Sequence, residues 1–143
     1  MAEDDADDRL LVKDALSECG LGNELRFVED GEDLMDYLLQ RGKHTGPDTA
    51  PRPGLILLDL NMPRKDGREV LREIRAHPDL RRIPVIAFTT SKADTDIGAL
   101  YDLGANSFIC KPVAFDALVN VMKTLSRYWF GIVELPGAQL KGI

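Results

Sequence analysis

Several features that often reveal a protein's chemistry are scarce in this sequence. It has only two cysteines and two histidines in 143 residues. Cys19 and Cys110 show neither a CxxC spacing nor a nearby histidine, so they predict no zinc site and no disulfide, and we interpret both as small buried hydrophobic residues. His44 and His77 have no serine, cysteine or metal-ligand partner close in the sequence. We assign these histidines no chemistry.

Two further absences concern membranes and nucleic acids. No apolar run is long enough to span a bilayer, and the acidic start MAEDDADD is unlike a secretory signal. We therefore expect a cytoplasmic protein with no membrane partner. The formal net charge is −6, without the excess of lysine and arginine that binding to a phosphate backbone requires, which argues against nucleic acid as the main partner.

Strand-like and helix-like patterns alternate along the chain, which predicts an α/β domain. Strands are expected over residues 25–30, 55–59, 84–89 and 107–110. Helices are expected from an N-cap at Asp5 to Gly20 or Gly22, around the apolar residues of 34–39, from Gly67 onward, over 95–103, and over 114–128. The glycines and prolines of 42–54 predict a surface loop.

The segment LILLDLNMP, residues 55–63, is the most informative part of the sequence. Its apolar run lacks polar alternation, as expected of a strand that is covered on both faces in a parallel sheet. Such sheets place their chemistry at the carboxyl ends of the strands, where Asp59 stands. A carboxylate at this position can be a nucleophile, although Asp also favours turns for its local hydrogen bonds.

Other polar residues occur at comparable positions. Glu3 and Asp4 open the chain, Thr89 ends an apolar run, and Lys111 ends another. A phosphoryl group is an anion, so its transfer to Asp59 requires a divalent cation. Carboxylates from Glu3 and Asp4 would supply hard oxygen ligands for Mg²⁺. Lys111 would then neutralise one phosphoryl oxygen, and the Thr89 hydroxyl would hydrogen-bond another.

In order and spacing, these motifs resemble the bacterial two-component response-regulator receiver domain. The motifs are Glu3-Asp4, Asp59 in DLNMP, Lys65-Asp66-Gly67, Thr89 in IAFTTS, and Lys111-Pro112. Within that family the chain is most similar to the stand-alone regulators associated with bacterial phytochromes, judged by DLNMPRKDGREVL, the long loop before residue 55 and the ending YWFGIVELP. The resemblance implies a doubly wound, flavodoxin-like parallel sheet of five strands in the order 2-1-3-4-5.

The resemblance also implies a function. Asp59 would accept a phosphoryl group from a sensor histidine kinase, with a phytochrome-type kinase as the narrower expectation. The implied magnesium ligands are Asp59, Asp4, the backbone carbonyl of Asn61, and Glu3 directly or through water. The protein would be a switch that acts by protein contact rather than a turnover enzyme. Its contact face would combine helix 95–103, strand 107–110 and the last helix.

Thr89 and Phe108 would form the switch in this interpretation. Many receivers carry tyrosine where this chain has Phe108, so packing alone must distinguish the two states. An ordinary core position for Phe108 is the alternative.

Other functions remain open at this point. The chain could be a chemotaxis-type receiver or an intermediate in a phosphorelay. A magnesium-dependent phosphatase of the haloacid dehalogenase type also uses a strand-end aspartate, but it needs a second carboxylate two residues on, where this chain has Asn61. A flavodoxin-like flavin carrier needs a Ser-, Thr- or Gly-rich phosphate loop after its first strand, and the acidic residues there would repel a phosphate.

Both ends of the chain carry further expectations. We expect a receiver domain over residues 1–128 and an apolar tail over 129–143 that forms a homodimer together with the last helix. The alternative is that Trp129 and Phe130 fold back on their own domain. At the other end, only Met1 and Ala2 precede Glu3, so the first strand looks truncated. We therefore expect a longer native protein, or a replacement strand supplied by another segment or a second subunit.

Overall fold

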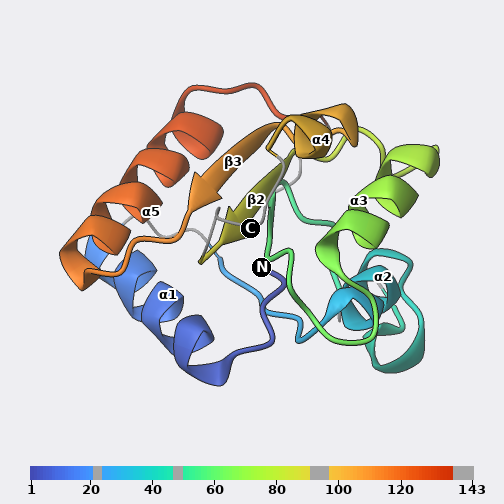
Figure 1. Ribbon diagram of the computed structural model, residues 1–143, viewed down its shortest axis with the longest axis horizontal. Helices are drawn as coiled ribbons and strands as arrows, with labels where there is room; N and C mark the ends of the chain where they lie inside the picture. Colours follow the sequence, from blue (N-terminus) through green and yellow to red (C-terminus); the bar gives the residue numbers. More distant parts are fainter. Residues whose placement is uncertain (21–23, 47–49, 91–96, 137–143) are drawn as a thin grey trace.

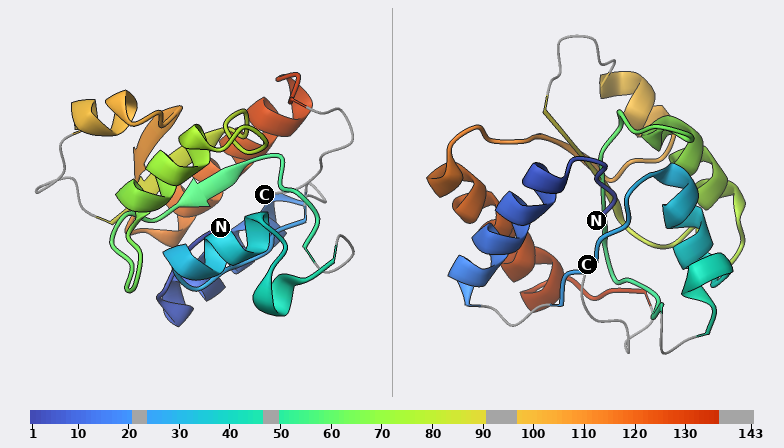
Figure 2. Two further views of the ribbon diagram at one scale, coloured as in Figure 1. Left: turned by 90° about the vertical axis from the view of Figure 1, so that its right-hand side faces the viewer. Right: turned by 90° about the horizontal axis from the view of Figure 1, so that it is seen from below.

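The computed structural model describes residues 1–20, 24–46, 50–90 and 97–136. Helices cover both faces of a parallel sheet, with α1 and α5 on one face and α2, α3 and α4 on the other (Figures 1 and 2). The helices are α1 (Ala6–Cys19), α2 (Gly31–Leu38), α3 (Gly67–Ala76), α4 (Ile97–Asp102) and α5 (Phe115–Gly131), with a short 3-10 helix at Gly42–His44. Within these described ranges, no helix has the length and apolar character needed to cross a bilayer.

The sheet contains three regular parallel strands in the order β1-β2-β3, namely β1 (Ile56–Leu58), β2 (Val85–Thr89) and β3 (Ser107–Cys110). Ala2 extends the sheet beyond β1, because it forms parallel bridges with Leu58 on one side and Val28 on the other. The spatial order of the five segments is therefore 2-1-3-4-5 when they are numbered along the chain. The doubly wound α/β class and the strand order are both confirmed.

The two segments of the sheet around Ala2 and Val28 are shorter than the strands expected of a regular five-stranded sheet. The expected strand over 25–30 pairs only at Val28. The pairing of the central strand involves Met1, Ala2 and Glu3. Its short ladder is complete on both sides. The Ala2 amide donates to the Leu57 carbonyl at 2.9 Å, and the Val28 amide donates to the Met1 carbonyl at 3.0 Å. Within the described ranges, no other segment takes this position.

Three aspartates begin the helices that surround the site. Asp5 caps α1, Asp30 caps α2 and Asp66 caps α3, each by accepting hydrogen bonds from amides of the first turn. The predicted start of α1 and its end at Gly20, which has a φ of 63°, are confirmed. These caps fix how the chain enters each helix, and two of the capped helices, α1 and α3, begin beside the acidic residues identified above.

The last helix differs from the prediction, because α5 continues to Gly131 instead of ending near residue 128. Trp129 and Phe130 therefore belong to the helix, and both pack partly buried against the core on the α1 and α5 face. Residues 137–143 of the expected tail lie outside the described residues.

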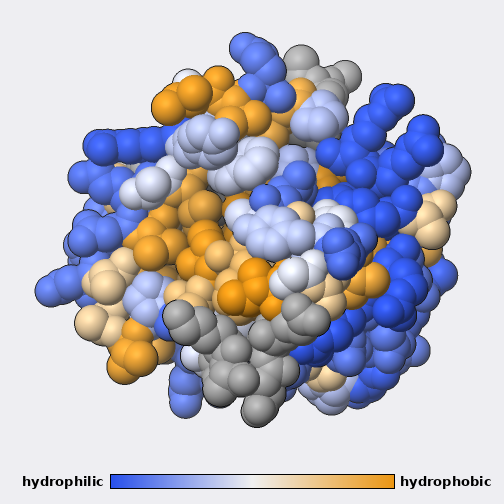
Figure 3. Space-filling view, turned by 45° about the horizontal axis from the view of Figure 1, so that its top comes forward, coloured by the Kyte–Doolittle hydropathy of each residue, from blue (hydrophilic) through white to orange (hydrophobic). Residues whose placement is uncertain are grey.

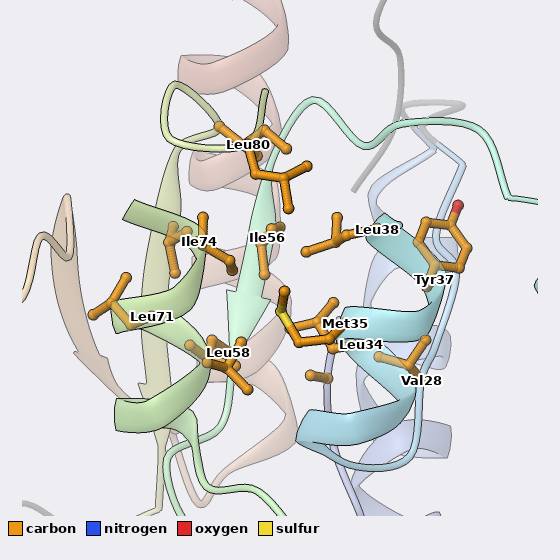
Figure 4. Close-up of a cluster of buried hydrophobic side chains, with 14 of the residues drawn as sticks. Val28, Leu34, Met35, Tyr37, Leu38, Ile56, Leu58, Leu71, Ile74 and Leu80 are labelled. Carbon is orange, nitrogen blue, oxygen red and sulfur yellow. The ribbon is translucent and has the colours of Figure 1, made fainter. Parts of the chain in front are cut away.

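The core has two halves, one on each face of the sheet. Leu55 and Leu57 project toward α1 and α5, whereas Ile56 and Leu58 project toward α2 and α3 (Figure 4). All four residues are at most 2 % exposed. This two-sided burial explains why the run before Asp59 shows no polar alternation.

The edge of the sheet explains one wrong prediction. β3 pairs only with β2, so its outer side has no neighbouring strand among the described residues. Cys110 at its end is exposed, not buried as its apolar neighbours suggested, while Cys19 is partly buried. Both cysteines are free thiols.

An open pocket lies where the central strand begins. It is lined by Met1, Arg26, Val28, Leu34, Tyr37, Pro53, Leu55 and Ile56. The amino group of Met1 donates to the Arg26 carbonyl at 2.7 Å, and burial lowers its pKa to about 5. Because the Leu57 carbonyl points toward Ala2, the Leu57 amide and the Leu55 carbonyl must point toward this side of β1 as well.

We predict that adding five apolar, mainly β-branched residues before Met1 will stabilise the protein. The added segment would continue the central strand, pair with the Leu55 and Leu57 backbone groups, and bury apolar side chains in the pocket. The net gain should be on the order of 2 kcal/mol, or about 5 °C in Tm. An extension of five glycines and serines is the control. Equal Tm values for the two extended proteins would contradict the prediction.

Candidate functional site

Asp59 follows β1 directly, at the carboxyl edge of the sheet. Its amide donates to the Ala2 carbonyl at 3.1 Å, so the central strand holds the backbone of Asp59 in place. Its side chain is 9 % exposed. One carboxylate oxygen accepts a weak hydrogen bond of 3.4 Å from the Asn61 amide. The structure therefore presents a nearly buried carboxylate whose neighbours come from the start of the chain.

Glu3, Asp4 and Asp59 form an acidic cluster, as the sequence predicts. Each offers a carboxylate oxygen, and these oxygens lie within 4.8 Å of one another. Glu3 is 1 % exposed, whereas Asp4 is exposed to solvent. The position of Glu3 is further fixed because the Asp5 amide donates to its carboxylate at 3.3 Å, and the Arg9 guanidinium donates to its carbonyl at 2.8 Å. Three hard oxygen donors at this spacing match the requirements of Mg²⁺.

Lys111 supplies the positive charge of the site. Its ammonium pairs with the Glu3 carboxylate, lies 3.5 Å from an oxygen of Asp8, and lies 3.8 Å from an oxygen of Asp59. The Lys111 amide donates to the Thr89 carbonyl at 2.7 Å, which ties the ends of β2 and β3 together. Burial lowers the pKa of Lys111 to about 8.

The pKa of Asp59 is raised above its ordinary value. The main cause is burial, which disfavours the charged carboxylate. The Asn61 amide and the Thr89 hydroxyl oppose this effect, while repulsion from Asp4 adds to it. A divalent cation at the cluster would reverse this balance, because it would stabilise the ionised form that acts as a nucleophile.

Thr89 and Phe108 lie on the same face of the sheet. Phe108 pairs with Ala87 in the parallel register, and Ala87 and Thr89 are two residues apart in β2. The Thr89 hydroxyl is buried and makes no hydrogen bond of ordinary length within the described part of the chain, although it lies close enough to the Asp59 carboxylate to lower its pKa. Phe108 is partly buried and packs against the core on the α2 and α3 side. The two residues thus share one face of the sheet at its carboxyl edge.

Two residues of this region were missed by the sequence analysis. Asp8 contacts Lys111 from the first turn of α1, and Arg64 forms a 2.6 Å ion pair with the buried carboxylate of Asp30. A signal existed for Asp8, because a helix that begins at an N-cap Asp5 turns its third residue back toward the preceding segment. No comparable local signal connects residues 30 and 64.

The model of the family described as response regulator receiver domain matches residues 1–123. This chain belongs to the response regulator receiver domain family. The matched residues include the whole acidic cluster and Lys111. The resemblance deduced from the sequence motifs is confirmed.

Individual relatives agree with this assignment. The response regulator Rcp1 of Synechocystis sp. is 41 % identical over 96 % of this chain and 92 % of its own length. Its solved Mn²⁺-bound form has a TM-score of 0.82, at 40 % identity and 95 % and 96 % coverage of the two chains. The phosphorylated cyanobacterial phytochrome response regulator RcpA has a TM-score of 0.85, at 41 % identity and 95 % coverage of both chains.

A third solved structure extends the relationship beyond cyanobacteria. The response regulator RPA3017, described in red light signalling of R. palustris, has a TM-score of 0.88 at 36 % identity, with 94 % coverage of both chains. This chain is thus related to phytochrome-associated regulators over nearly its full length and nearly the full length of each of those solved chains. The narrower resemblance deduced from the loop and the ending is also confirmed.

We predict that Gly67→Ala will destabilise the protein and disturb Asp59. A Cβ atom at Gly67 would lie 2.6 Å from the Asp59 carbonyl oxygen and 2.8 Å from the Cα of Leu60, so the start of α3 would have to move. The free energy of unfolding should fall by roughly 1–3 kcal/mol. Gly131→Ala is the matched control, because no atom lies within 4 Å of its added Cβ. Equal urea midpoints for the two variants would show that the close approach at Gly67 does not affect the stability of the protein.

Proposed function

We propose that the protein is a phosphorylation switch in which Asp59 is the phosphoryl acceptor. The observation that carries the proposal is the position of the Asp59 carboxylate. It lies at the carboxyl end of a buried strand, within the acidic cluster, and 3.8 Å from the Lys111 ammonium. Relatives of high similarity are described as Mn²⁺-bound and as phosphorylated, which supports both parts of the proposal.

The proposed step transfers a phosphoryl group without net oxidation or reduction. An Asp59 oxygen attacks the phosphorus of a phosphohistidine on a sensor kinase, the phosphorus–nitrogen bond breaks, and the leaving imidazole nitrogen takes a proton. The product is an acyl phosphate. Water later cleaves it to the carboxylate and inorganic phosphate. Each phosphoryl group therefore requires a new donor molecule, as in a switch rather than a turnover enzyme.

The residues of the site fit a divalent cation. Glu3, Asp4 and Asp59 supply carboxylate oxygens, and we propose that the Asn61 carbonyl completes the set of protein ligands. Bound Mg²⁺ supplies charge neutralisation between the carboxylates and an incoming phosphoryl anion. Lys111 would contribute the remaining neutralisation as an ion pair to a phosphoryl oxygen.

Thr89 and Phe108 would change conformation when Asp59 is phosphorylated. The Thr89 hydroxyl makes no hydrogen bond of ordinary length in the described ranges but lies beside the Asp59 carboxylate, so it would donate to an acyl phosphate oxygen there. Movement of Thr89 would leave space on the sheet face that Phe108 shares, and the ring would turn inward to fill it. Because Phe108 lacks a hydroxyl, this response depends on packing alone.

We further propose that the phosphoryl donor is a phytochrome-type histidine kinase. Two of the similar solved structures are described as a phytochrome response regulator and as a regulator in red light signalling. The switch would operate in the cytoplasm, and its output would be a protein contact on the face formed by α4, β3 and α5. A chemotaxis-type or phosphorelay receiver would use the same chemistry with another donor.

Acetyl phosphate and Mg²⁺ should add one phosphoryl group to the wild type and none to Asp59→Asn. Intact-mass spectrometry measures both outcomes, with Asp66→Asn as a control that removes a carboxylate outside the cluster. Lys111→Ala should still accept phosphoryl, but without the stabilising ion pair. Labelling of Asp59→Asn to the wild-type level would show that another residue is the acceptor.

The homodimer predicted from the sequence belongs to this proposal as well. Hydrophobic side chains gather on the face shown in Figure 3. On α5 and after it, Tyr128 is 50 % exposed and Ile132 is 73 % exposed, while Trp129 and Phe130 pack against the core. The contact would therefore use Tyr128 and Ile132, whereas Trp129 and Phe130 support the helix from beneath.

The dimer is tested by charge insertion at its centre. Ile132→Asp should convert a dimer into a monomer, because an unpaired carboxylate would be buried in the contact. Val113→Asp is the control, since Val113 is fully exposed before α5 begins. Multi-angle light scattering reports the mass. A wild-type monomer, or a dimer that survives Ile132→Asp, would exclude this contact.

A further inference from the structure

Among the described residues, Asp8 is the one carboxylate beside Lys111 that the proposed chemistry does not use. It lies in the first turn of α1, where Asp5 caps its backbone amide at 3.2 Å. Its side-chain oxygen is 3.5 Å from the Lys111 ammonium, which is closer than the 3.8 Å between that ammonium and Asp59. Asp8 is not part of the cluster formed by Glu3, Asp4 and Asp59. Its position therefore indicates a role toward the lysine and not toward the cation.

The ammonium of Lys111 is shared among carboxylates. Within the described ranges its ion pairs are with Glu3, Asp8 and Asp59, and its side chain is 7 % exposed. An acyl phosphate on Asp59 would bring additional negative charge and would need this ammonium as its counter-charge. Lys111 would then have to move away from Asp8. The Asp8 carboxylate would lose its partner and remain beside a more negative group, and both effects disfavour the phosphorylated state.

We propose that Asp8 is a positioning residue that holds Lys111 in its resting place and thereby weakens the phosphorylated state. The inference rests on the proposed acceptor role of Asp59 and adds a residue that sets the balance between the two states. Asp8 and Asp59 also influence each other directly, because repulsion from Asp59 contributes to the raised pKa of Asp8, after the larger effects of burial and of Asp5. The side chain is 31 % exposed, so we expect a modest effect that salt reduces.

The test uses beryllium trifluoride with Mg²⁺, because this complex binds a carboxylate oxygen with the geometry of a phosphoryl group. Asp8→Asn should bind it about fivefold more tightly than the wild type, as measured by isothermal titration calorimetry. Asp8→Glu keeps the charge and should stay near the wild-type affinity. Asp7→Asn is the matched control, since it removes the same charge from the same helix turn. Equal or weaker binding by Asp8→Asn would overturn the inference, and so would an equal gain in Asp7→Asn.

Two further measurements separate positioning from other roles. The gain from Asp8→Asn should disappear in a Lys111→Met background, because the effect acts through the ammonium. Mg²⁺ affinity in the absence of beryllium trifluoride should change less than binding of the complex does. Persistence of the full gain without Lys111, or a parallel change in Mg²⁺ affinity, would assign Asp8 a general electrostatic effect and overturn positioning.

The outcome also distinguishes this inference from the proposed function. If the wild type binds beryllium trifluoride, Asp59→Asn does not, and Asp8→Asn matches the wild type, only the role of Asp8 fails. If Asp59→Asn binds as well as the wild type, the acceptor assignment fails and the role of Asp8 fails with it.

Discussion

The structure depends above all on one buried ammonium held among carboxylates. Glu3 and Asp59 are almost completely buried, and the side chain of Lys111 is 7 % exposed. Buried charges without a partner cost several kcal/mol each, so none of these groups would be stable in this position alone. They come from three separate segments, namely the start of the chain, the end of β1 and the end of β3. The site therefore forms only when the sheet has assembled these segments.

A short central strand in the sheet positions the carboxylates of the site. Ala2 pairs with Val28 on one side and with Leu57 and Asp59 on the other, and it places Glu3 and Asp4 at the same edge as Asp59. Beyond the edge, Gly67 lets the start of α3 approach the Asp59 backbone. Few backbone hydrogen bonds thus determine the position of three reactive carboxylates. The two-sided core of β1 gives these bonds a rigid base.

The charge balance of the site agrees with a protein that changes state by binding ions. Among the described residues, the carboxylates of Glu3, Asp8 and Asp59 pair with the ammonium of Lys111, and Asp4 adds a fourth carboxylate to the acidic cluster. This excess of negative charge favours a cation and resists an anion until the cation is present. A receiver needs this behaviour, because it must remain unmodified without its donor and respond when the donor arrives. Lys111 has three carboxylate partners among the described residues, and the proposed switch would change how its ammonium is shared among them.

The sequence by itself determined the α/β class, the starts of α1 and α3 and the prominence of Asp59, whereas the strand order followed from the resemblance of its motifs to the receiver family. These depend on local patterns: an apolar run covered on both faces, aspartates that cap helices, and polar residues at strand ends. The tertiary structure alone decided how these parts meet. The contact between Asp8 and Lys111 joins residues 103 positions apart, and only assembly of α1 against the sheet creates it. Likewise, Cys110 is exposed because β3 lies at an edge, and Trp129 extends α5 because the core offers it a packing surface. Local sequence patterns do not predict such contacts, since burial and strand pairing depend on segments that meet only after folding.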